Sequence, residues 1–559
     1  MTEVAAPTAG PYVSVVVLAR RGGAHLRGCV SALVRQSLPA SDFEIVVVDD
    51  GAAGDVGAAL AALGARPVPR VVRCAAGEGR ATGVRAAAGE FCLLLGEHTI
   101  AHPALAAEHL RAQRAGRGVV GVGRLAPRLR AGAHPFARYC ADEAERARAQ
   151  LDRGERPVSF TDCSAHNLSA PRSALAALAA ARGLDDDLAA GAGVGLAYRL
   201  HLAGLPLAWV AEGRAEERHG ASFRAAAGAV EAEGAAAMAL YRRHPPLLPL
   251  LRLGAFTATT RRSVPLRRAL LAARVPPRLL SAGGALLGRA PGGRPHAVVY
   301  DHCYWSGVRR AAPDRDTWQR LTRGPVILMY HAVGAAGEPA RHYVVPARAF
   351  AWQMVWLARR GYRVLPLGEL VRCLREHRLP PARSVVITFD DGYADNRDAA
   401  APELRRRGFP ATIFLVSDLV GEANRWDAAG ELAGRPLLSW ADARALERDG
   451  IAFGAHSRRH ASLTSVDAGR LAEEVAGSRQ AIDGALGHPT ETFAYPFGHF
   501  DAATAAAVER AGFLGACCSR SGVVDPATPL FALPRVEVRG TDSLRRFALC
   551  VWLGRRRVA

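Results

Sequence analysis

The chain has 559 residues, which is enough for two to four domains that each bury a hydrophobic core. All 72 of its basic residues are arginine, and the net charge is +20. Because the arginines run through the whole chain and no basic-and-aromatic nucleic-acid module is recognisable, the charge indicates a compositional bias and argues against nucleic acid as a partner.

Three features that the sequence lacks bear on the cellular compartment of the protein. No run of 18 uncharged apolar residues occurs, so no membrane-spanning helix is predicted. Residues 1–10 lack the charged start and apolar region of a signal peptide. The 10 cysteines show no Cys-x-x-Cys spacing, which is typical of a reducing compartment. We therefore expect a cytoplasmic protein, with peripheral contact at the inner face of the membrane as an open alternative.

The amino-terminal third alternates apolar strands with helical periodicity. Residues 12–18 and 43–51 have the pattern of buried strands, and residues 29–36 between them have that of a helix. This order indicates a βαβ unit with a parallel sheet, whose ligands bind beyond the carboxyl ends of the strands. The second strand ends there in Asp49 and Asp50.

Residues 12–240 resemble the family 2 glycosyltransferases. The resemblance rests on Asp49-Asp50-Gly51 followed by Asp55, and on Gly79-Arg-Ala-Thr-Gly83. It implies an α/β domain over residues 1–240 with the nucleotide-diphospho-sugar-transferase (GT-A) fold. In that family, the residues at Asp49, Asp50 and Asp55 hold the base and ribose of a nucleotide-sugar.

Two acidic motifs of that family are missing. The metal-binding Asp-x-Asp is replaced by Gly96-Glu97-His98, and the Gly-Glu-Asp that supplies the catalytic base is replaced by Gly191-Ala192-Gly193. Glu97, His98 and His219, which matches a terminal histidine of the family, could still form a metal site. We expect a degenerate domain that binds a nucleotide-sugar, a glycan end or a partner. A domain that still transfers sugar is the alternative.

Residues 241–320 have a different composition, with arginine pairs, Pro276-Pro277 and Gly292-Gly293. These breaks exclude one long helix, and we expect a linker between two domains. Leu266–Arg274 is amphipathic and basic, so it either lies on an anionic membrane surface or packs on a neighbouring domain. Packing on a neighbour is the favoured interpretation.

Residues 321–559 contain three motifs. The apolar run Ser384–Phe389 ends at Asp390-Asp391-Gly392, as a buried parallel strand does when it delivers carboxylates to the end of a sheet or barrel. The run Ile451–Ala455 precedes His456 and His460, which lie on one face if a helix begins there. Two imidazoles and a carboxylate form a ligand set for a divalent metal with one position left open.

With the third motif, Phe493-Ala-Tyr-Pro-Phe-Gly498, these segments resemble the polysaccharide deacetylases (carbohydrate esterase family 4, the NodB homology domain) in order and spacing. The resemblance implies a deformed (β/α) barrel and a hydrolase that deacetylates an N-acetylated amino sugar. The implied roles are Asp390 as base and Asp391, His456 and His460 as ligands of Zn²⁺; Co²⁺ or Ni²⁺ would also suit them. The segment Tyr495, Pro496 and Phe497 would face the oxyanion or substrate.

The chain departs from that family at two positions. Phe493 stands where an arginine often orients the base, and Arg535 is the candidate replacement. The late Leu-x-x-His segment that supplies the general acid is not evident. His331 follows the apolar residues of the segment 325–333. This segment resembles the Tyr-His segment of deacetylases of poly-N-acetylglucosamine, which implies that His331 is the acid. A structural strand-end histidine is the alternative, and His499 is a further candidate.

Two other functions stay open. The protein is either bifunctional, transferring a sugar and then trimming it, or a non-catalytic glycan-binding scaffold. The scaffold hypothesis requires the deacetylase site to be empty although its residues are present.

Overall fold

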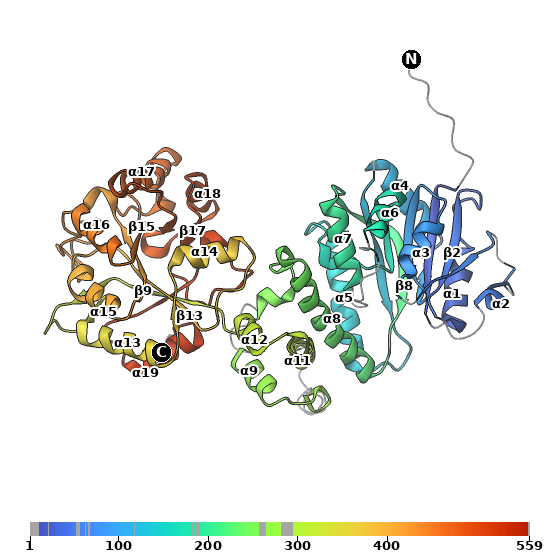
Figure 1. The fold of residues 1–559 in the computed structure, drawn as a ribbon, viewed down its shortest axis with the longest axis horizontal. Helices are drawn as coiled ribbons and strands as arrows, with labels where there is room; N and C mark the ends of the chain where they lie inside the picture. The colour runs from blue at the N-terminus through green and yellow to red at the C-terminus, as the bar shows by residue number, and fades with distance from the viewer. Residues whose placement is uncertain are drawn as a thin grey trace, which may run out of the picture. The chain divides into compact units, whose positions relative to one another are not determined.

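The computed structural model describes residues 11–556 except 21, 52–55, 62, 65–66, 76, 117, 182–183, 185–190, 257–263 and 281–293. The chain forms two compact units (Figure 1). Unit 1 comprises Met1–His244 and Pro265–Ala311, and unit 2 comprises Pro245–Val264 and Ala312–Ala559.

Unit 1 is built on an eight-stranded mixed sheet. Its strands are β1 (Val13–Ala19), β2 (Phe43–Asp49), β3 (Arg70–Arg73), β4 (Phe91–Gly96), β5 (Thr99–Ala101), β6 (Val120–Arg128), β7 (Asn167–Pro171) and β8 (Leu207–Arg218). Its helices are α1 (Gly23–Leu33), α2 (Val56–Ala61), α3 (Gly79–Ala86), α4 (Leu105–Ala115), α5 (Pro135–Asp152), α6 (Arg172–Ala180), α7 (Ala192–Leu202), α8 (Phe223–Arg243), α9 (Val264–Ala272) and α11 (Arg294–Ala311).

The strand order is β3-β2-β1-β4-β7-β6-β8-β5. The pairs β3–β2, β2–β1 and β1–β4 are parallel, as the βαβ pattern predicts, and β7 pairs antiparallel with β4. The helix expected over 29–36 begins earlier and ends at Leu33, because its buried stripe is made by Leu26, Cys29, Val30 and Leu33.

The segment expected as a linker, 241–320, is divided between the two units. In unit 1, α11 packs closely on α8: a Cβ on Gly234 would lie 2.0 Å from the carbonyl oxygen of Tyr304. Arg267 of α9 is buried and pairs with Asp301 of α11 at 2.7 Å. The amphipathic segment Leu266–Arg274 therefore packs on its neighbour in the chain.

Unit 2 is a parallel barrel surrounded by helices. Its strands are β9 (Val326–Tyr330), β10 (Ala332–Gly334), β11 (Val344–Pro346), β12 (Arg363–Val364), β13 (Ser384–Phe389), β14 (Ala411–Leu415), β15 (Ile451–Ala455), β16 (Thr492–Ala494), β17 (Gly515–Cys517) and β18 (Arg535–Glu537). Its helices are α12 (Arg315–Thr322), α13 (Ala347–Arg359), α14 (Leu367–Arg375), α15 (Ala401–Arg405), α16 (Trp440–Arg448), α17 (Ala468–Leu486), α18 (Ala502–Arg510) and α19 (Leu544–Leu553).

The barrel strands follow the order β17-β16-β15-β14-β13-β9-β18. A parallel bridge between Cys517 and Leu533, just before β18, links the two ends of this order. The strands are buried on both faces, which explains their continuous apolar runs. The α/β fold class expected for both parts, including the deformed barrel, is confirmed.

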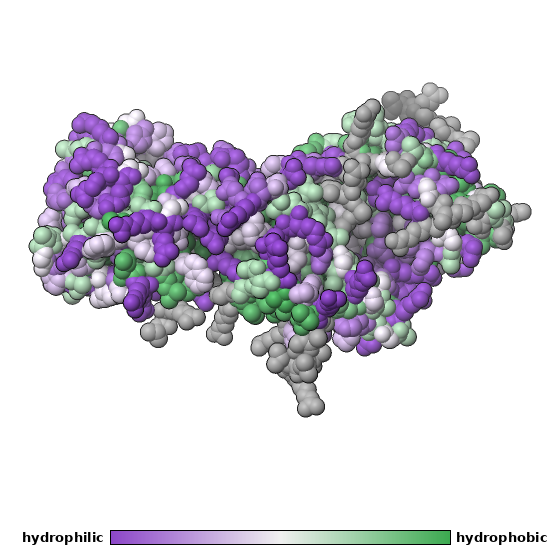
Figure 2. Space-filling view, turned by 60° about the horizontal axis from the view of Figure 1, so that its bottom comes forward, coloured by the Kyte–Doolittle hydropathy of each residue, from purple (hydrophilic) through white to green (hydrophobic). Residues whose placement is uncertain are grey.

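The composition is reflected in the surface and the thiols. Figure 2 shows hydrophilic residues spread over the visible face rather than gathered in one patch, as expected for a chain-wide arginine bias. All ten cysteines are unpaired. Among the described residues, no helix has both the length and the apolar character that crossing a membrane requires.

Candidate metal centre and neighbouring sites

The two acids and two histidines of the first motifs meet at one end of the barrel. Asp391 follows β13, and His456 follows β15; both strands pair with β14, so their carboxyl ends share this edge. Ligand atoms of Asp391, His456 and His460 all lie within 4.8 Å of one another. The Nε2 atoms of His456 and His460 are 3.4 and 3.3 Å from Oδ1 of Asp391.

The chemistry of this group fits a divalent metal ion. All three side chains are buried, and Oδ1 of Asp391 has no hydrogen-bond partner in the described structure. Nδ1 of His456 lies 2.7 Å from the carbonyl oxygen of Ala494, which can only accept, so Nδ1 carries the proton and Nε2 is a free lone pair. Burial lowers the pKa of His456 to about 4, which keeps this imidazole neutral.

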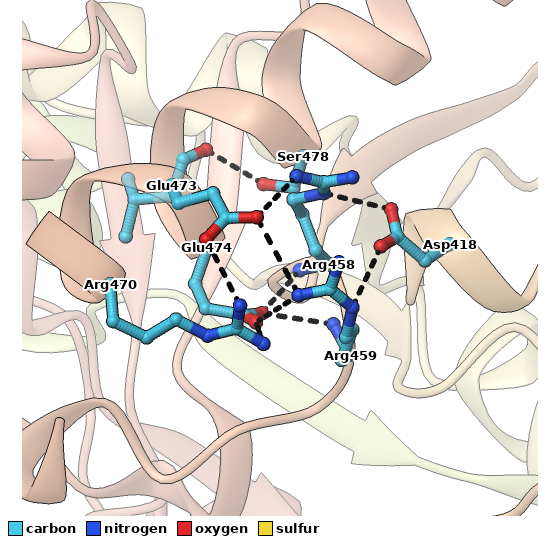
Figure 3. Close-up of polar contacts among 8 residues, drawn as sticks. Asp418, Arg458, Arg459, Arg470, Glu473, Glu474 and Ser478 are labelled. Carbon is cyan, nitrogen blue, oxygen red and sulfur yellow. Dashed lines mark hydrogen bonds and ion pairs between the residues drawn. The ribbon is translucent and has the colours of Figure 1, made fainter.

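No helix begins at His456, so the two imidazoles are not brought together by the i, i+4 spacing of a helix. Residues 456–460 form a loop in which Ser457 (φ 62°) and His460 (φ 58°) are left-handed. The buried carboxylate of Glu474, on α17, accepts the backbone N–H of Arg458 at 3.0 Å and of Arg459 at 2.9 Å (Figure 3). The two imidazole centroids are 4.9 Å apart because the loop folds around Glu474.

Ion pairs hold the same loop from two sides (Figure 3). Arg458 and Arg459 pair with Asp418, which follows β14, at 2.9 and 3.1 Å. Arg458 also pairs with Glu473 of α17 at 2.8 Å. The metal-ligand loop is therefore fixed to both β14 and α17.

Arg535 of β18 binds the carboxylate of Asp390 through two hydrogen bonds. Its Nη1 donates to Oδ1 at 2.6 Å and its Nη2 to Oδ2 at 2.8 Å, and both side chains are buried. Burial raises the pKa of Asp390, but the Arg535 charge outweighs it, so the pKa lies below its ordinary value. Phe493 lies in the core, so Asp390 is held by Arg535 of β18 instead of by a residue of the third motif.

His331 follows β9, and β9 pairs with β13 so that Tyr330 is opposite Phe389. His331 and Asp390 therefore follow partners in one register, and the N–H of Asp390 donates to Tyr330 O at 2.9 Å. The His331 Nδ1 is buried without a hydrogen-bond partner in the described structure. His499, by contrast, is exposed.

The third motif contributes backbone and one aromatic ring. Tyr495 is buried, and its N–H donates to Cys517 O at 3.1 Å and its hydroxyl to Phe531 O at 3.0 Å. Pro496 is buried. Phe497 has φ 59°, is 53% exposed, and its ring lies 4.6 Å from the His460 ring.

The sequence motifs missed a second aromatic contact. Trp426, in the segment between β14 and α16, stacks on the His460 ring at 4.7 Å and 19°. Nearby, Asn424 donates to the Tyr393 hydroxyl at 2.8 Å. No motif distinguishes Trp426 in the sequence, because its position depends on a long segment that folds back over the barrel.

In unit 1 a cavity of about 1310 Å³ contains several of the predicted nucleotide-sugar residues, including Glu97, His98 and His219. Asp50 lies beside it, where it accepts hydrogen bonds from Arg20 at 3.0 Å and from the N–H of Gly77 at 3.3 Å. Asp49 pairs with Arg73 at 3.8 Å. Asp55 lies outside the described residues.

Glu97, His98 and His219 do not form a metal-ligand group. Among the described residues, Asp391, His456 and His460 are the one such cluster. Glu97 accepts the N–H of Gly22 at 2.9 Å, and His98 packs edge-on against His25. His219 pairs with Glu217 at 3.2 Å.

At two of the missing acidic positions, Gly96 and Gly193, the space for a side chain is filled by other atoms. A Cβ on Gly96 would lie 3.0 Å from the His166 ring, whose Nδ1 bonds to Glu217. A Cβ on Gly193 would lie 2.5 Å from Cys163 O and 2.6 Å from Ala165 N. The sequence analysis missed His166 and Glu217, because their role depends on contact across the sheet.

Comparison with known families agrees with this geometry. Residues 377–516, which hold Asp390, Asp391, His456 and His460, match the family model described as polysaccharide deacetylase. The chain carries a polysaccharide deacetylase domain. Residues 14–176 match the family model described as glycosyl transferase family 2. The chain is thus an enzyme of the deacetylase class, a hydrolase of carbon–nitrogen bonds, behind a family 2 domain.

Relatives match the deacetylase domain to different extents. YxkH of Bacillus subtilis, assigned to the polysaccharide deacetylases, is 29% identical over 234 residues, 41% of this chain and 78% of YxkH. The poly-beta-1,6-N-acetyl-D-glucosamine N-deacetylase of Escherichia coli K12 is 24% identical over 40% of this chain and 38% of its own length. The Staphylococcus epidermidis enzyme of the same name is 31% identical over 90 residues, 16% of this chain and 31% of its own length.

Solved structures are similar to the same part of the chain. IcaB from Ammonifex degensii has 26% identity and a TM-score of 0.36, covering 41% of this chain and 97% of that one. The Streptococcus pyogenes deacetylase PplD, solved with acetate, has 23% identity and a TM-score of 0.36, covering 41% of this chain and 98% of that one.

Proposed function

We propose that unit 2 removes the acetyl group from an N-acetylated amino sugar of a glycan or glycan precursor, and that it needs a divalent metal, with Zn²⁺ as the expected ion. The observation that carries the proposal is the buried group of Asp391, His456 and His460 beside an Asp390 carboxylate held by Arg535. A bound divalent ion supplies Lewis acidity, which acidifies water and polarises an acyl oxygen.

Each remaining residue has a distinct task. Asp390 accepts a proton from the attacking water, and Arg535 keeps its carboxylate ionised and oriented. The backbone N–H near Phe497 donates to the oxyanion of the tetrahedral intermediate. His331 donates a proton to the amine as the carbon–nitrogen bond breaks.

The substrate class is supported by the relatives and by the surroundings of the site. Two relatives are named as deacetylases of poly-beta-1,6-N-acetyl-D-glucosamine. Phe497 and Trp426 flank His460, and Tyr343 lies 4.7 Å from His331 between ring centroids. We expect these aromatic faces to hold the apolar faces of N-acetylhexosamine rings.

A bifunctional enzyme is the second candidate, since the family 2 match favours it. The filled positions at Gly96 and Gly193 weigh against transfer by the usual acidic residues.

The cytoplasmic location stays a prediction, as does peripheral membrane contact. Leu544, Leu549 and Trp552 of α19 are exposed and line a cavity of about 610 Å³ with four arginines, which suits an anionic surface.

The test measures metal and acetate in parallel. Purified chain is expected to hold one equivalent of zinc-like metal and to release acetate from N-acetylglucosamine oligomers. The His456→Ala/His460→Ala double variant is expected to lose both. Asp390→Asn is the matched variant: it keeps the metal and loses acetate release by about 100-fold or more. Metal retained by the double variant would overturn the ligand assignment, and full activity of Asp390→Asn would overturn the assignment of the base.

A further inference from the structure

The unit 1 cavity has lost its metal-binding acids and is strongly basic. Glu97 is the single carboxylate among the described residues that line it, against five arginines and four histidines. The Glu97 carboxylate already has partners within the protein, because Oε2 accepts the Gly22 N–H and Oε1 lies 3.7 Å from His98 Nε2. A ligand entering this cavity therefore meets positive charge.

His166 occupies the space where the first aspartate of an Asp-x-Asp motif would project. Its ring carbons lie 3.0 Å from the Cβ that residue 96 would carry. Glu217 fixes the ring by bonding to Nδ1, and its other oxygen holds His219 at 3.2 Å. Imidazoles that are fixed at the cavity wall thus replace carboxylates that would have held a metal.

Two cavity arginines have no carboxylate partner in the described part of the chain, Arg130 after β6 and Arg218 at the end of β8. By comparison, Arg20 pairs with Asp50 and Arg128 with Glu216. The N–H of Arg218 donates to His98 O at 3.2 Å, so its backbone is anchored beside the histidines. Exposed guanidinium groups are well suited to bidentate recognition of phosphate.

We propose that this cavity binds a diphosphate group directly through arginine and histidine side chains, without a divalent metal ion. The guanidinium groups of Arg130 and Arg218 supply the charge that a metal supplies elsewhere. At about 1310 Å³ the cavity exceeds the roughly 300–1,000 Å³ of ordinary small-molecule sites, so it has room for a diphosphate and the group attached to it. That group is either a nucleoside or a lipid chain.

The test is calorimetric titration of the full chain in EDTA with pyrophosphate, uridine diphosphate and farnesyl diphosphate. Binding of at least one diphosphate is expected, with an affinity that Mn²⁺ leaves unchanged. Tighter binding of uridine diphosphate identifies a nucleoside as the attached group, and tighter binding of farnesyl diphosphate identifies a lipid.

Matched variants separate a built site from general positive charge. Arg130→Ala/Arg218→Ala is expected to weaken binding at least tenfold while acetate release by unit 2 is unchanged. Arg214→Ala, on the same strand but paired with Glu212 outside the cavity, is expected to bind normally. Binding that appears only with Mn²⁺, no binding at all, or an equal loss in Arg214→Ala would overturn the proposal.

Discussion

Arg535 and Asp390 are 145 residues apart in the chain and form a buried bidentate pair. Removing one partner of such a pair strongly lowers the stability of the fold, because the other partner is left as a buried charge without a counter-charge. The same contact that orients Asp390, the proposed base, therefore also stabilises the barrel by joining β18 to the residue after β13.

Arg535→Met is expected to lower the free energy of unfolding of unit 2 by about 3–5 kcal/mol and to abolish acetate release. In Asp390→Asn/Arg535→Met neither position carries a charge, so its loss of stability is expected to be smaller than the sum of the single losses. Urea unfolding measures both. Arg539→Met, which breaks a more exposed pair with Glu537, serves as control and is expected to cost about 1 kcal/mol or less. Additive losses would contradict the buried-charge argument.

His109 is a second residue whose effect on the stability of the fold can be predicted. It lies in unit 1 between Ser169 Oγ at 2.8 Å and Asn167 Oδ1 at 3.0 Å, and burial lowers its pKa to about 4. The unfolded chain binds a proton near pH 6.5, whereas the folded chain does not until about pH 4. Falling pH across this window therefore favours the unfolded state.

We expect unit 1 to lose up to about 3 kcal/mol of stability as the pH falls from 6.5 to 4 through this one group. His109→Gln keeps a polar side chain without a titrating group, so its stability is expected to depend less on pH in the same window. Unfolding midpoints at pH 5 and pH 7 provide the comparison. An identical pH dependence in the variant would show that His109 is not the cause.

At the scale of elements, the loop 456–460 depends on α17. Glu474 is fully buried and accepts two backbone N–H groups of the loop, whereas its neighbour Glu473 is partly exposed and pairs with Arg458 and Arg470 (Figure 3). The orientation of both histidines therefore depends on a carboxylate that does not itself reach the ligand cluster.

Glu474→Ala is expected to weaken metal binding by about 10–100-fold, as loss of an outer-shell partner does. Glu473→Ala is expected to leave the affinity within a few-fold of the parent, since its contact with the loop is an ion pair between the partly exposed side chains of Glu473 and Arg458. Competition with a chelating dye measures both dissociation constants. Equal effects in the two variants would mean that the loop is held by its ion pairs and not by the buried acceptor.

At the scale of the whole molecule, the two units exchange segments. The chain leaves unit 1 at His244, contributes Pro245–Val264 to unit 2, and returns to unit 1 before unit 2 resumes at Ala312. Leu248, Leu253 and Phe256 of the exchanged segment are buried, and a Cβ on Gly254 would lie 3.2 Å from Ala527 N. This segment is therefore part of the deacetylase unit.

A fragment 265–559 is expected to be less stable than 245–559 by several kcal/mol, because each buried apolar side chain contributes roughly 1.5–3 kcal/mol. Both fragments retain the same residues downstream, so the difference isolates Pro245–Val264. The measurement is the midpoint of thermal unfolding of the barrel in each fragment. Equal midpoints would show that the segment adds nothing to the barrel.

The sequence by itself determined the two folds and most of the candidate metal centre. Runs such as Ser384–Phe389 are buried on both faces of a parallel barrel, so their hydrophobicity shows directly in the sequence. The acids and histidines that follow these strands necessarily meet at one barrel edge. Asp390, Asp391, His456 and His460 could be found for that reason.

Only the tertiary structure decided how those residues are held and what surrounds them. The segment that begins at His456 is a loop and not a helix, and Glu474, from a distant helix, accepts two of its backbone N–H groups. Trp426 reaches His460, and His166 fills the space beside Gly96, through contacts between segments remote in the chain. The local hydrophobic pattern of the sequence indicates which residues of a helix or strand are buried. It carries no information about which distant side chain completes a hydrogen bond or occupies a void.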